Sequence, residues 1–378
     1  KKAGEFILEK IKKFFCSQTV LAVSIICAVI SACIVPLSSE YLSYINFSTL
    51  ILLFCLMSAV AGFNDTGIFV RISSFLVSKC HTSRLLMFIL MNVCFFSSML
   101  ITNDVSLITF VPVTIALFKS AGISRKNNLI FAVIIETASA NLGSMMTPIG
   151  NPQNIFICSY YGLSPSDFFK TMLPYGVLSY IMLSLMTLLI NNEKIKSSEK
   201  TERKPVPKFQ ALIYSAVFII CILTVSGFIN KYICFIICSV LIALSDYKIF
   251  LKVDYALLAT FVCFFIFSGN IGNIEGIQNF ISSVINGNEI ISSALTSQII
   301  SNVPSAVLLS GFTDNAEKLL IGVNIGGLGT PVASLASLIS YKYYSKSENA
   351  ENGKYMLLFI ISGFAMLFVM IGVGIFYV

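Results

Sequence analysis

The sequence has little charge for its length and very few of the residues that most soluble catalytic sites use. Of its 378 residues only 11% are charged, whereas soluble domains carry about 25%. It contains no Trp and a single His, His81, which argues against a His-based metal centre or a Ser-His nucleophile pair. Neither a P-loop nor a Gly-x-Gly-x-x-Gly fingerprint occurs. These absences argue against an ordinary soluble domain and against an enzyme.

Apolar residues take the place of the missing charge: they make up 56% of the chain, and 32 of them are Phe. Apolar runs of about 20 residues, the length that spans a bilayer core, alternate with short charged clusters. We therefore predict an all-α polytopic membrane protein with about ten membrane elements in contact with lipid. The net charge of +7 comes from these short clusters, where basic residues set topology, so we expect no nucleic-acid partner.

The cysteines lie mostly inside the apolar runs. No Cys-x-x-Cys pair occurs, although Cys234 and Cys238 share one helix face. We interpret the cysteines as small core hydrophobes rather than as metal ligands or redox groups. The eleven are Cys16, Cys27, Cys33, Cys55, Cys80, Cys94, Cys158, Cys221, Cys234, Cys238 and Cys263.

One pattern occurs twice, in residues 141–151 and 324–334, which align without a gap and share an Asn, a Gly and a Thr-Pro pair. Gly costs backbone entropy and Pro removes a donor, so the helix should open at both places. In a bilayer the freed backbone groups must face protein, water or a ligand, which predicts a binding site between two repeats. The predicted helix breaks are Gly143, Pro148, Gly326 and Pro331.

The placement of Lys and Arg predicts the topology. With the N-terminus in the cytoplasm of a prokaryotic cell, only Lys170, Lys231 and Lys318 of the 25 basic residues fall outside the plasma membrane. The predicted segments are a cytoplasmic interfacial helix at 1–17, a first repeat at 18–190, a cytoplasmic linker at 191–208 and a second, inverted repeat at 209–378.

Each predicted repeat contains a re-entrant hairpin. Both ends of the segment 84–118 are basic, so this segment should enter and leave on the cytoplasmic side, with a polar tip at residues 102–104. The segment 292–309 should enter from outside, with its tip at Ser301 and Asn302. The two hairpins, together with the two broken helices, form the predicted inverted repeat.

Opened helices meeting hairpin tips at mid-membrane offer helix N-termini for anions and carbonyl oxygens for cations. Asn, Ser and Thr add donors and acceptors without permanent charge. We predict one cation site per repeat, suited to Na⁺: Thr102 and Asn103 with carbonyls near Gly150, and Ser301 and Asn302 with carbonyls near Ala333. The predicted substrate contacts are Thr102, Asn103, Asp104, Asn151, Ser301, Asn302 and Thr330.

Two acids are candidates for coupling because ionisable groups deep in a membrane are usually functional. They are Asp104, which could instead cap its own helix, and Glu136, which could instead be a structural acid bonded to a Ser or Thr. The coupling ion would be Na⁺ or H⁺, and we expect no other cofactor. We expect the remaining acids of the apolar region to be interfacial, namely Asp65, Asp254, Glu275 and Glu289.

Together these motifs resemble the ion transporter superfamily, which includes divalent-anion/sodium symporters, citrate transporters, arsenite efflux permeases and some Na⁺/H⁺ antiporters. The resemblance spans about residues 18–377 and rests on Thr102-Asn103-Asp104, Ser301-Asn302-Val303, the Thr147-to-Asn154 segment and the Gly326-to-Pro331 segment. In the dicarboxylate branch the tip Asn and neighbouring carbonyls bind Na⁺, which implies that role for Asn103 and Asn302. Scaffolds of this superfamily are often dimeric, which implies a homodimer.

Asp104 and Val303 stand where the dicarboxylate branch has Thr, and both tips look rather like the arsenite permease branch. The Thr147-to-Asn154 segment instead resembles anion permeases of the citrate type, so the two signals conflict. An ionised Asp104 would repel a dicarboxylate unless a cation neutralised it. The sequence thus predicts a cation-coupled secondary active transporter of a small anion, such as a di- or tricarboxylate or another oxyanion, working by alternating access. An arsenite or antimonite efflux permease or a Na⁺/H⁺ antiporter is the alternative.

Overall fold

The computed structural model describes residues 18–36, 40–67, 71, 80–120, 123, 126–195, 207–348 and 350–377. Helices dominate these residues, and no strand occurs among them. A lipid environment offers no hydrogen bonds to the backbone, so apolar segments satisfy their own N–H and C=O groups as helices. The predicted all-α class is confirmed.

Seven helices within the described ranges are long and apolar enough to cross a membrane. This finding confirms the prediction of a multi-pass membrane protein. The seven segments are Phe47–Asp65, Ser83–Ile101, Pro165–Leu189, Lys208–Val225, Lys231–Lys252, Tyr255–Gly272 and Asn352–Ile375, and a shorter apolar helix covers Val20–Ile34.

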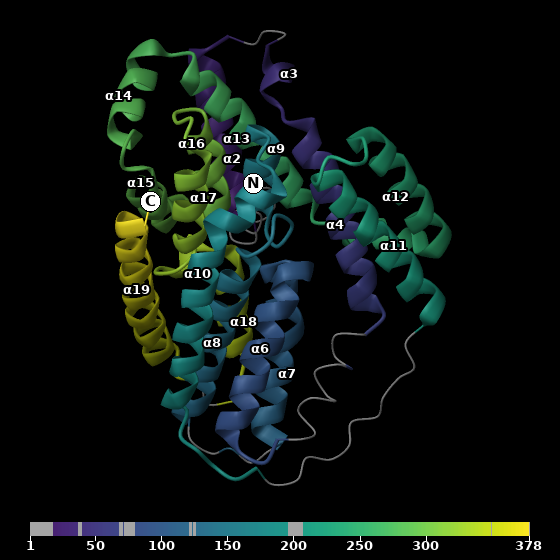
Figure 1. The fold of residues 1–378 in the computed structure, drawn as a ribbon, viewed down its shortest axis with the longest axis vertical. Coiled ribbons are helices and arrows are strands. Elements are labelled where there is room, and N and C mark those ends of the chain that lie inside the picture. Colours follow the sequence, from purple (N-terminus) through teal and green to yellow (C-terminus); the bar gives the residue numbers. More distant parts are fainter. Residues whose placement is uncertain are drawn as a thin grey trace, which may run out of the picture.

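One part of the molecule is a set of helices that carries neither hairpin. Helix α4 packs against α11 and α12 and forms a group on the right of Figure 1, while α2 packs against α13. The amphipathic α14 lies at the upper end. The bounds are α2 (Thr19–Ile34), α3 (Tyr41–Tyr44), α4 (Phe47–Asp65), α11 (Lys208–Val225), α12 (Lys231–Asp246), α13 (Tyr255–Gly272) and α14 (Glu275–Ile285).

The other part holds two hairpins, in each of which a single residue separates the two helices, and two interrupted helices. In Figure 1, α8 and α18 lie in the lower half and α9 and α17 above them, so the interrupted segments run in opposite directions. The hairpins are α6 (Ser83–Ile101) with α7 (Asn103–Ser120), and α15 (Glu289–Ile300) with α16 (Asn302–Ser310). The interrupted segments are α8 (Lys126–Ser144) with α9 (Pro152–Tyr161), and α17 (Ala316–Ile325) with α18 (Leu335–Tyr344). They are followed by α10 (Pro165–Met186) and α19 (Asn352–Tyr377).

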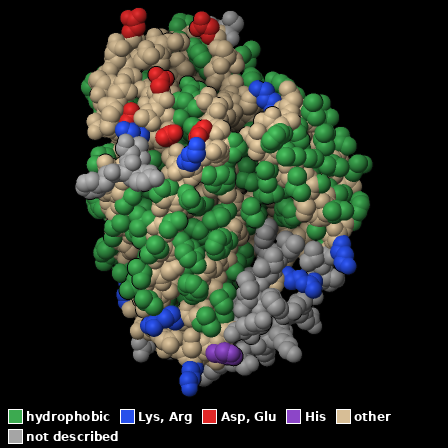
Figure 2. Space-filling view, in the orientation of Figure 1, with side chains coloured by type: hydrophobic (Ala, Val, Ile, Leu, Met, Phe, Trp, Pro, Cys, Tyr) green, Lys and Arg blue, Asp and Glu red, His purple; other side chains and the backbone are tan. Residues whose placement is uncertain are grey.

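Charge is distributed unevenly between the two ends of the molecule. In Figure 2 acidic side chains gather at the upper end, where α14 lies, and several basic side chains at the lower end. This is the asymmetry on which the topology prediction rests, with the lower end as the cytoplasmic side. The orientation itself, like the division into repeats, stays a prediction.

Three of the four acids predicted to be interfacial are exposed, namely Asp65, Asp254 and Glu275. The prediction was wrong for Glu289, which is only 5% exposed. Its carboxylate accepts hydrogen bonds from the Gly287 amide at 3.1 Å and from the Thr313 hydroxyl at 3.4 Å. An acid at the start of a helix can thus be held by neighbouring loops instead of by water.

Two predicted segments fall largely outside the described residues: the interfacial helix at 1–17 and most of the linker, at 196–206. The described start of the linker lies beside the first hairpin. The Ser83 amide donates to the Glu193 carbonyl at 2.9 Å, and the Arg84 guanidinium donates to the carbonyls of Leu188 and Ile190.

Candidate functional site

Both hairpins turn through a residue with positive φ. Thr102 has φ 68° and Ser301 has φ 76°, and they are the non-glycine residues with positive φ in the described part of the chain. Such a conformation is costly for residues with a Cβ, and strain of this kind is concentrated at functional sites. The following helix starts in the same way in both: the Ser106 amide donates to the Thr102 carbonyl at 3.1 Å, and Ser305 to Ser301 at 3.0 Å.

The Asn that follows each turn adopts the same conformation in both hairpins. The side-chain oxygen of Asn103 accepts from the Asp104 amide at 3.0 Å, and that of Asn302 accepts from the Val303 amide at 2.9 Å. Both Asn side chains are buried. Each tip Asn therefore has its oxygen directed at its own helix start, which leaves the side-chain NH₂ for other contacts.

A Ser hydroxyl closes each hairpin in the same register. Ser106 donates to the Cys94 carbonyl at 3.3 Å, and Ser305 donates to the Ser293 carbonyl at 3.2 Å, twelve residues back in both cases. These contacts join α6 to α7 and α15 to α16 across each hairpin. The two tips are thus built on one backbone plan although their sequences differ.

The first opened stretch lies between Ser144, where α8 ends, and Pro152, where α9 begins. Its polar backbone groups are bonded mainly by one side chain, Asn154, whose NH₂ donates to the Thr147 carbonyl at 2.9 Å and also reaches the carbonyls of Ser144 and Met145. The side-chain oxygen of Asn151 caps α9 by accepting from the Asn154 amide at 2.9 Å. Pro148 lies within this stretch.

The second opened stretch follows Ile325 and contains a short 3₁₀ turn, η3 (Pro331–Ala333). Here Gln298 of α15 bonds the backbone: its amide donates to the carbonyls of Gly326 at 2.8 Å and Leu328 at 2.9 Å and accepts from the Thr330 amide at 2.9 Å. The Thr330 hydroxyl also donates to the Gln298 carbonyl at 3.1 Å. Thr330, a predicted substrate contact, is therefore bonded to the second hairpin.

The two opened stretches contact each other through reciprocal hydrogen bonds. Asn151, after the first opening, donates to the side-chain oxygen of Asn324, before the second, at 2.9 Å. Ser334, after the second opening, donates to the side-chain oxygen of Asn141, before the first, at 2.9 Å. In the gapless alignment of the two motifs Asn151 corresponds to Ser334 and Asn141 to Asn324. All four are buried. In both directions, the last residue of one motif donates a hydrogen bond to the first residue of the other.

Both hairpin tips join this network. The NH₂ group of Asn103 donates to the side-chain oxygen of Asn141 at 3.0 Å. On the other side the Ser301 hydroxyl lies 3.4 Å from the Ala333 carbonyl, next to Ser334. We call the set Asn103, Asn141, Asn151, Asn154, Asn324, Ser301 and Ser334 the central amide network. Asn141, Asn154, Asn324 and Ser334 belong to the repeated motif or its flank, but were not among the predicted site residues.

The structure brings one predicted cation site together more closely than the other. In the second hairpin the Ser301 hydroxyl lies 3.4 Å from both the Asn302 side-chain oxygen and the Ala333 carbonyl. Asn302 also faces Gly327, where an added Cβ would lie 3.1 Å from its side-chain nitrogen. In the first hairpin, no hydrogen bond among the described residues joins Gly150 to Thr102 or Asn103.

The two candidate coupling acids lie in different surroundings. Asp104 is partly exposed, its carboxylate accepts no hydrogen bond from the described residues, and it interacts electrostatically with Asp254. Glu136 is fully buried, accepts a 2.5 Å hydrogen bond from Thr114, and has a second oxygen with no hydrogen-bond partner among the described residues. Neither acid is hydrogen-bonded to the central amide network.

Two predicted helix-break glycines permit a close approach between helices. Gly143 lies inside the last turn of α8, so the helix opens later than predicted, at Met145. A Cβ on Gly143 would lie 2.2 Å from the Phe95 carbonyl oxygen of α6, and one on Gly326 would lie 2.9 Å from Ala294 of α15. Each interrupted helix therefore packs directly against the backbone of its hairpin.

A cavity of about 10 Å³ is lined by Asn141 of the network, by Gly327 of the second opened stretch and by Phe359 of α19. This volume holds about one water molecule. This cavity would therefore have to widen before it could hold a larger solute. The geometry is that of an enclosed polar centre made of opened backbone and amide side chains at the meeting point of four segments.

The family model described as Citrate transporter matches residues 6–318. The chain belongs to the citrate transporter family. The resemblance drawn from the two motif pairs is thereby confirmed, because this family is one of those grouped in the ion transporter superfamily. A membrane transporter also fits the seven candidate spans.

Curated relatives of this citrate transporter family member are named as transporters or membrane proteins. An uncharacterized transporter of Methanocaldococcus jannaschii is 34% identical over 84% of this chain and 86% of its own length. The inner membrane protein YbiR of Escherichia coli is 32% identical over 79% of this chain and 80% of its own. A putative transporter arsB of Dictyostelium discoideum is 32% identical over 41% of this chain and 27% of its own.

Proposed function

We propose that this transporter is a cation-coupled secondary active carrier of a small anion, such as a di- or tricarboxylate or another oxyanion. The observation that carries the proposal is the central amide network, in which both hairpin tips and both opened stretches meet. No Lys or Arg belongs to this network. An anion would instead be held by the positive ends of α7, α9 and α16 and by amide NH₂ groups.

The coupling cation would bind on the tip side of the same centre. Ser301, Asn302 and the Ala333 carbonyl form an oxygen-rich set in the second hairpin, and hard cations such as Na⁺ prefer such ligands. Thr102 and Asn103 occupy the equivalent turn, and the carbonyl of Gly150 would complete that site after a local movement. A cation bound at either tip would offset the charge of the anion and so couple the two affinities.

An efflux permease for arsenite or antimonite, or a Na⁺/H⁺ antiporter, is the second candidate. It is favoured by Asp104, whose partly exposed carboxylate interacts with Asp254, because two neighbouring acids attract a cation or proton and repel a dianion. The match to a relative named putative transporter arsB points the same way, over 41% of this chain.

Uptake into proteoliposomes distinguishes the two candidates. Purified protein is reconstituted, and accumulation of labelled citrate and succinate is measured with an inward Na⁺ gradient, with an H⁺ gradient and with neither. We expect gradient-dependent accumulation that stops when an ionophore collapses the gradient. Absence of any carboxylate accumulation, with arsenite movement or Na⁺/H⁺ exchange intact in the same vesicles, would reject the first candidate in favour of the second.

We further propose that the chain works as a homodimer in the plasma membrane of a prokaryotic cell, with its N-terminus in the cytoplasm. Both points rest on the superfamily resemblance and on the distribution of basic residues. Mass measurement of the detergent-extracted protein, together with protease protection of a tag at the N-terminus in oriented vesicles, tests them.

A further inference from the structure

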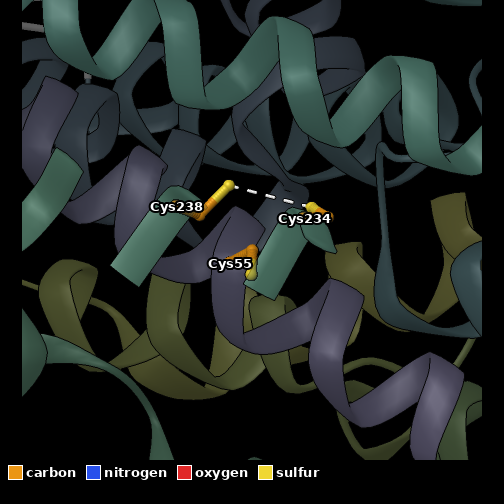
Figure 3. A group of neighbouring side chains, drawn as sticks. All are labelled: Cys55, Cys234 and Cys238. Carbon is orange, nitrogen blue, oxygen red and sulfur yellow. Dashed lines mark hydrogen bonds between the residues drawn. The ribbon is translucent and has the colours of Figure 1, made fainter. Parts of the chain in front are cut away.

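Three thiols from two helices meet in the group formed by α4, α11 and α12. The sulfur atoms of Cys55, on α4, and of Cys234 and Cys238, on α12, all lie within 4.8 Å of one another, and Figure 3 shows the three side chains. Cys221, from α11, belongs to the same apolar core but is not one of the residues whose sulfur atoms meet this distance. All four side chains are fully buried. We call these four residues the thiol cluster.

The arrangement has a feature beyond apolar packing. The sequence indicated core positions for these cysteines, with Cys234 and Cys238 on one helix face, and all four belong to the apolar core, but the sulfur atoms of Cys55, Cys234 and Cys238 also converge. Thiolates are the preferred ligands of soft d¹⁰ metal ions. In a tetrahedral zinc site with Zn–S bonds of about 2.3 Å, neighbouring sulfur atoms lie about 3.8 Å apart. The observed Cys234–Cys238 sulfur separation is 3.7 Å.

We propose that the thiol cluster is a binding site for a thiophilic d¹⁰ cation of the Zn²⁺ type, with Cys55, Cys234 and Cys238 as ligands and Cys221 as a neighbouring thiol. The site ties α4 and α12 together at one point. It lies outside the central amide network, none of whose residues belongs to these helices. The cation there is therefore structural and distinct from the transported or coupling ion.

A cavity of about 250 Å³ lies near the thiol cluster. Leu52, Thr224 and Lys231 line this cavity, and each lies three residues, about one helical turn, from a cysteine of the cluster. The cavity also has hydroxyl and amide groups at its wall, from Ser48, Ser159 and Asn230. An ion that enters this cavity would have about one helical turn left to pass before it reached the buried thiols.

The charge balance of the site favours three thiolates. Each thiol that binds a metal releases its proton, so three thiolates around one divalent ion leave a net charge of −1. Lys231, at the start of α12 and one turn before Cys234, supplies one positive charge at the cavity wall. Cys221 then remains a neutral neighbouring thiol. A complete set of four thiolates would bury a further negative charge without a partner.

The direct test is metal binding by the full-length protein in detergent. Purified under reducing conditions, stripped with a chelator and then exposed to Cd²⁺ or Zn²⁺, the wild type should retain about one ion per chain after desalting. Cd²⁺ should also produce sulfur-to-metal charge-transfer absorption. The triple variant Cys55→Ala/Cys234→Ala/Cys238→Ala should lose both signals, and Cys94→Ala, a buried cysteine of α6, should keep them.

Two results would overturn the proposal: wild-type protein that retains no Cd²⁺ or Zn²⁺ and shows no charge-transfer band, or a triple variant that binds as much metal as the wild type. Either would leave the thiol cluster as apolar packing only. If the triple variant cannot be extracted, Cys238→Ala alone should weaken retention at least tenfold. Absence of the charge-transfer band in the wild type would overturn the proposal without any variant, whereas its presence is assigned to the cluster by the loss in Cys238→Ala.

Discussion

The two hairpins have the same backbone conformation at their tips but differ in charge. Thr102 and Ser301 turn the chain in the same way, and the Asn after each directs its side-chain oxygen to the next amide. The residue that supplies this amide is Asp104 in the first hairpin and Val303 in the second. The shared backbone is suited to holding ligands in both halves, whereas Asp104 places at the first tip an acid that the second tip lacks.

The largest effect is expected from the residues that the hairpins share. Asn103→Ala and Asn302→Ala should each abolish transport in proteoliposomes while the protein remains extractable and folded. Each removes a tip amide, Asn103 from the central amide network and Asn302 from the predicted cation site beside it. Asn286→Ala is the matched control, since Asn286 is an exposed residue at the end of α14. Uptake at the wild-type rate in either tip variant would remove that residue from the site.

The next largest effect is expected at Gln298, a position at which the two hairpins differ. Gln298 bonds two carbonyls and one amide of the second opened stretch, while the equivalent residue of the first hairpin is Met99. Gln298→Leu leaves buried polar groups without partners and should lower the free energy of unfolding by about 1–3 kcal/mol. Met99→Leu, a volume-conserving change, should cost under about 1.5 kcal/mol. Thermal unfolding in detergent measures both, and equal losses would contradict this role of Gln298.

The charge difference can be removed by a single substitution. Asp104→Asn keeps the shape of the first tip but abolishes its negative charge, and should weaken the dependence of transport on the cation or proton gradient roughly tenfold, equivalent to about 1.4 kcal/mol. Val303→Thr, a neutral change at the matched position, should leave that dependence unaltered. The measurement is initial uptake against the concentration of the coupling ion. An unchanged gradient dependence in Asp104→Asn would show that coupling resides elsewhere.

The smallest effect concerns the strained turns. Thr102→Gly and Ser301→Gly should each raise stability by about 1 kcal/mol, because glycine adopts positive φ without strain. Thr102→Ala and Ser301→Ala keep the Cβ and should give no such gain. Similar gains in stability in the two glycine variants would support a shared backbone conformation of the two turns. A gain at one turn alone would show that the two turns are not equivalent.

Sequence reasoning located the tips well because polar residues inside apolar runs are conspicuous. The structure places the turns at Thr102 and Ser301, next to the Asn residues that were singled out. Sequence reasoning could not predict the role of Gln298, since an amide side chain in a helix gives no sign of which backbone groups it will contact. The burial of Glu289 was missed for a related reason: composition does not tell whether a helix start faces water or loops.

The convergence of the cysteines lay beyond sequence reasoning altogether. Cys55 and Cys238 are separated along the chain by the first hairpin, the first interrupted helix, α10 and α11, and nothing in their spacing relates them. Only the packing of α4 against α11 and α12 brings them together. The reciprocal bonds of Asn151 with Asn324 and of Ser334 with Asn141 were similarly hidden, although the motif repeat had marked their segments.

The absence of a side chain at Gly143 and Gly326 has a consequence for how the carrier can work. Backbone lies against backbone at these two points, so a hairpin cannot swing away from its interrupted helix without opening a void. In the alternating-access cycle that we propose, each hairpin and its partner helix would be displaced together. Access to the centre would then alternate when such bodies slide past the remaining helices, rather than when a hairpin opens alone.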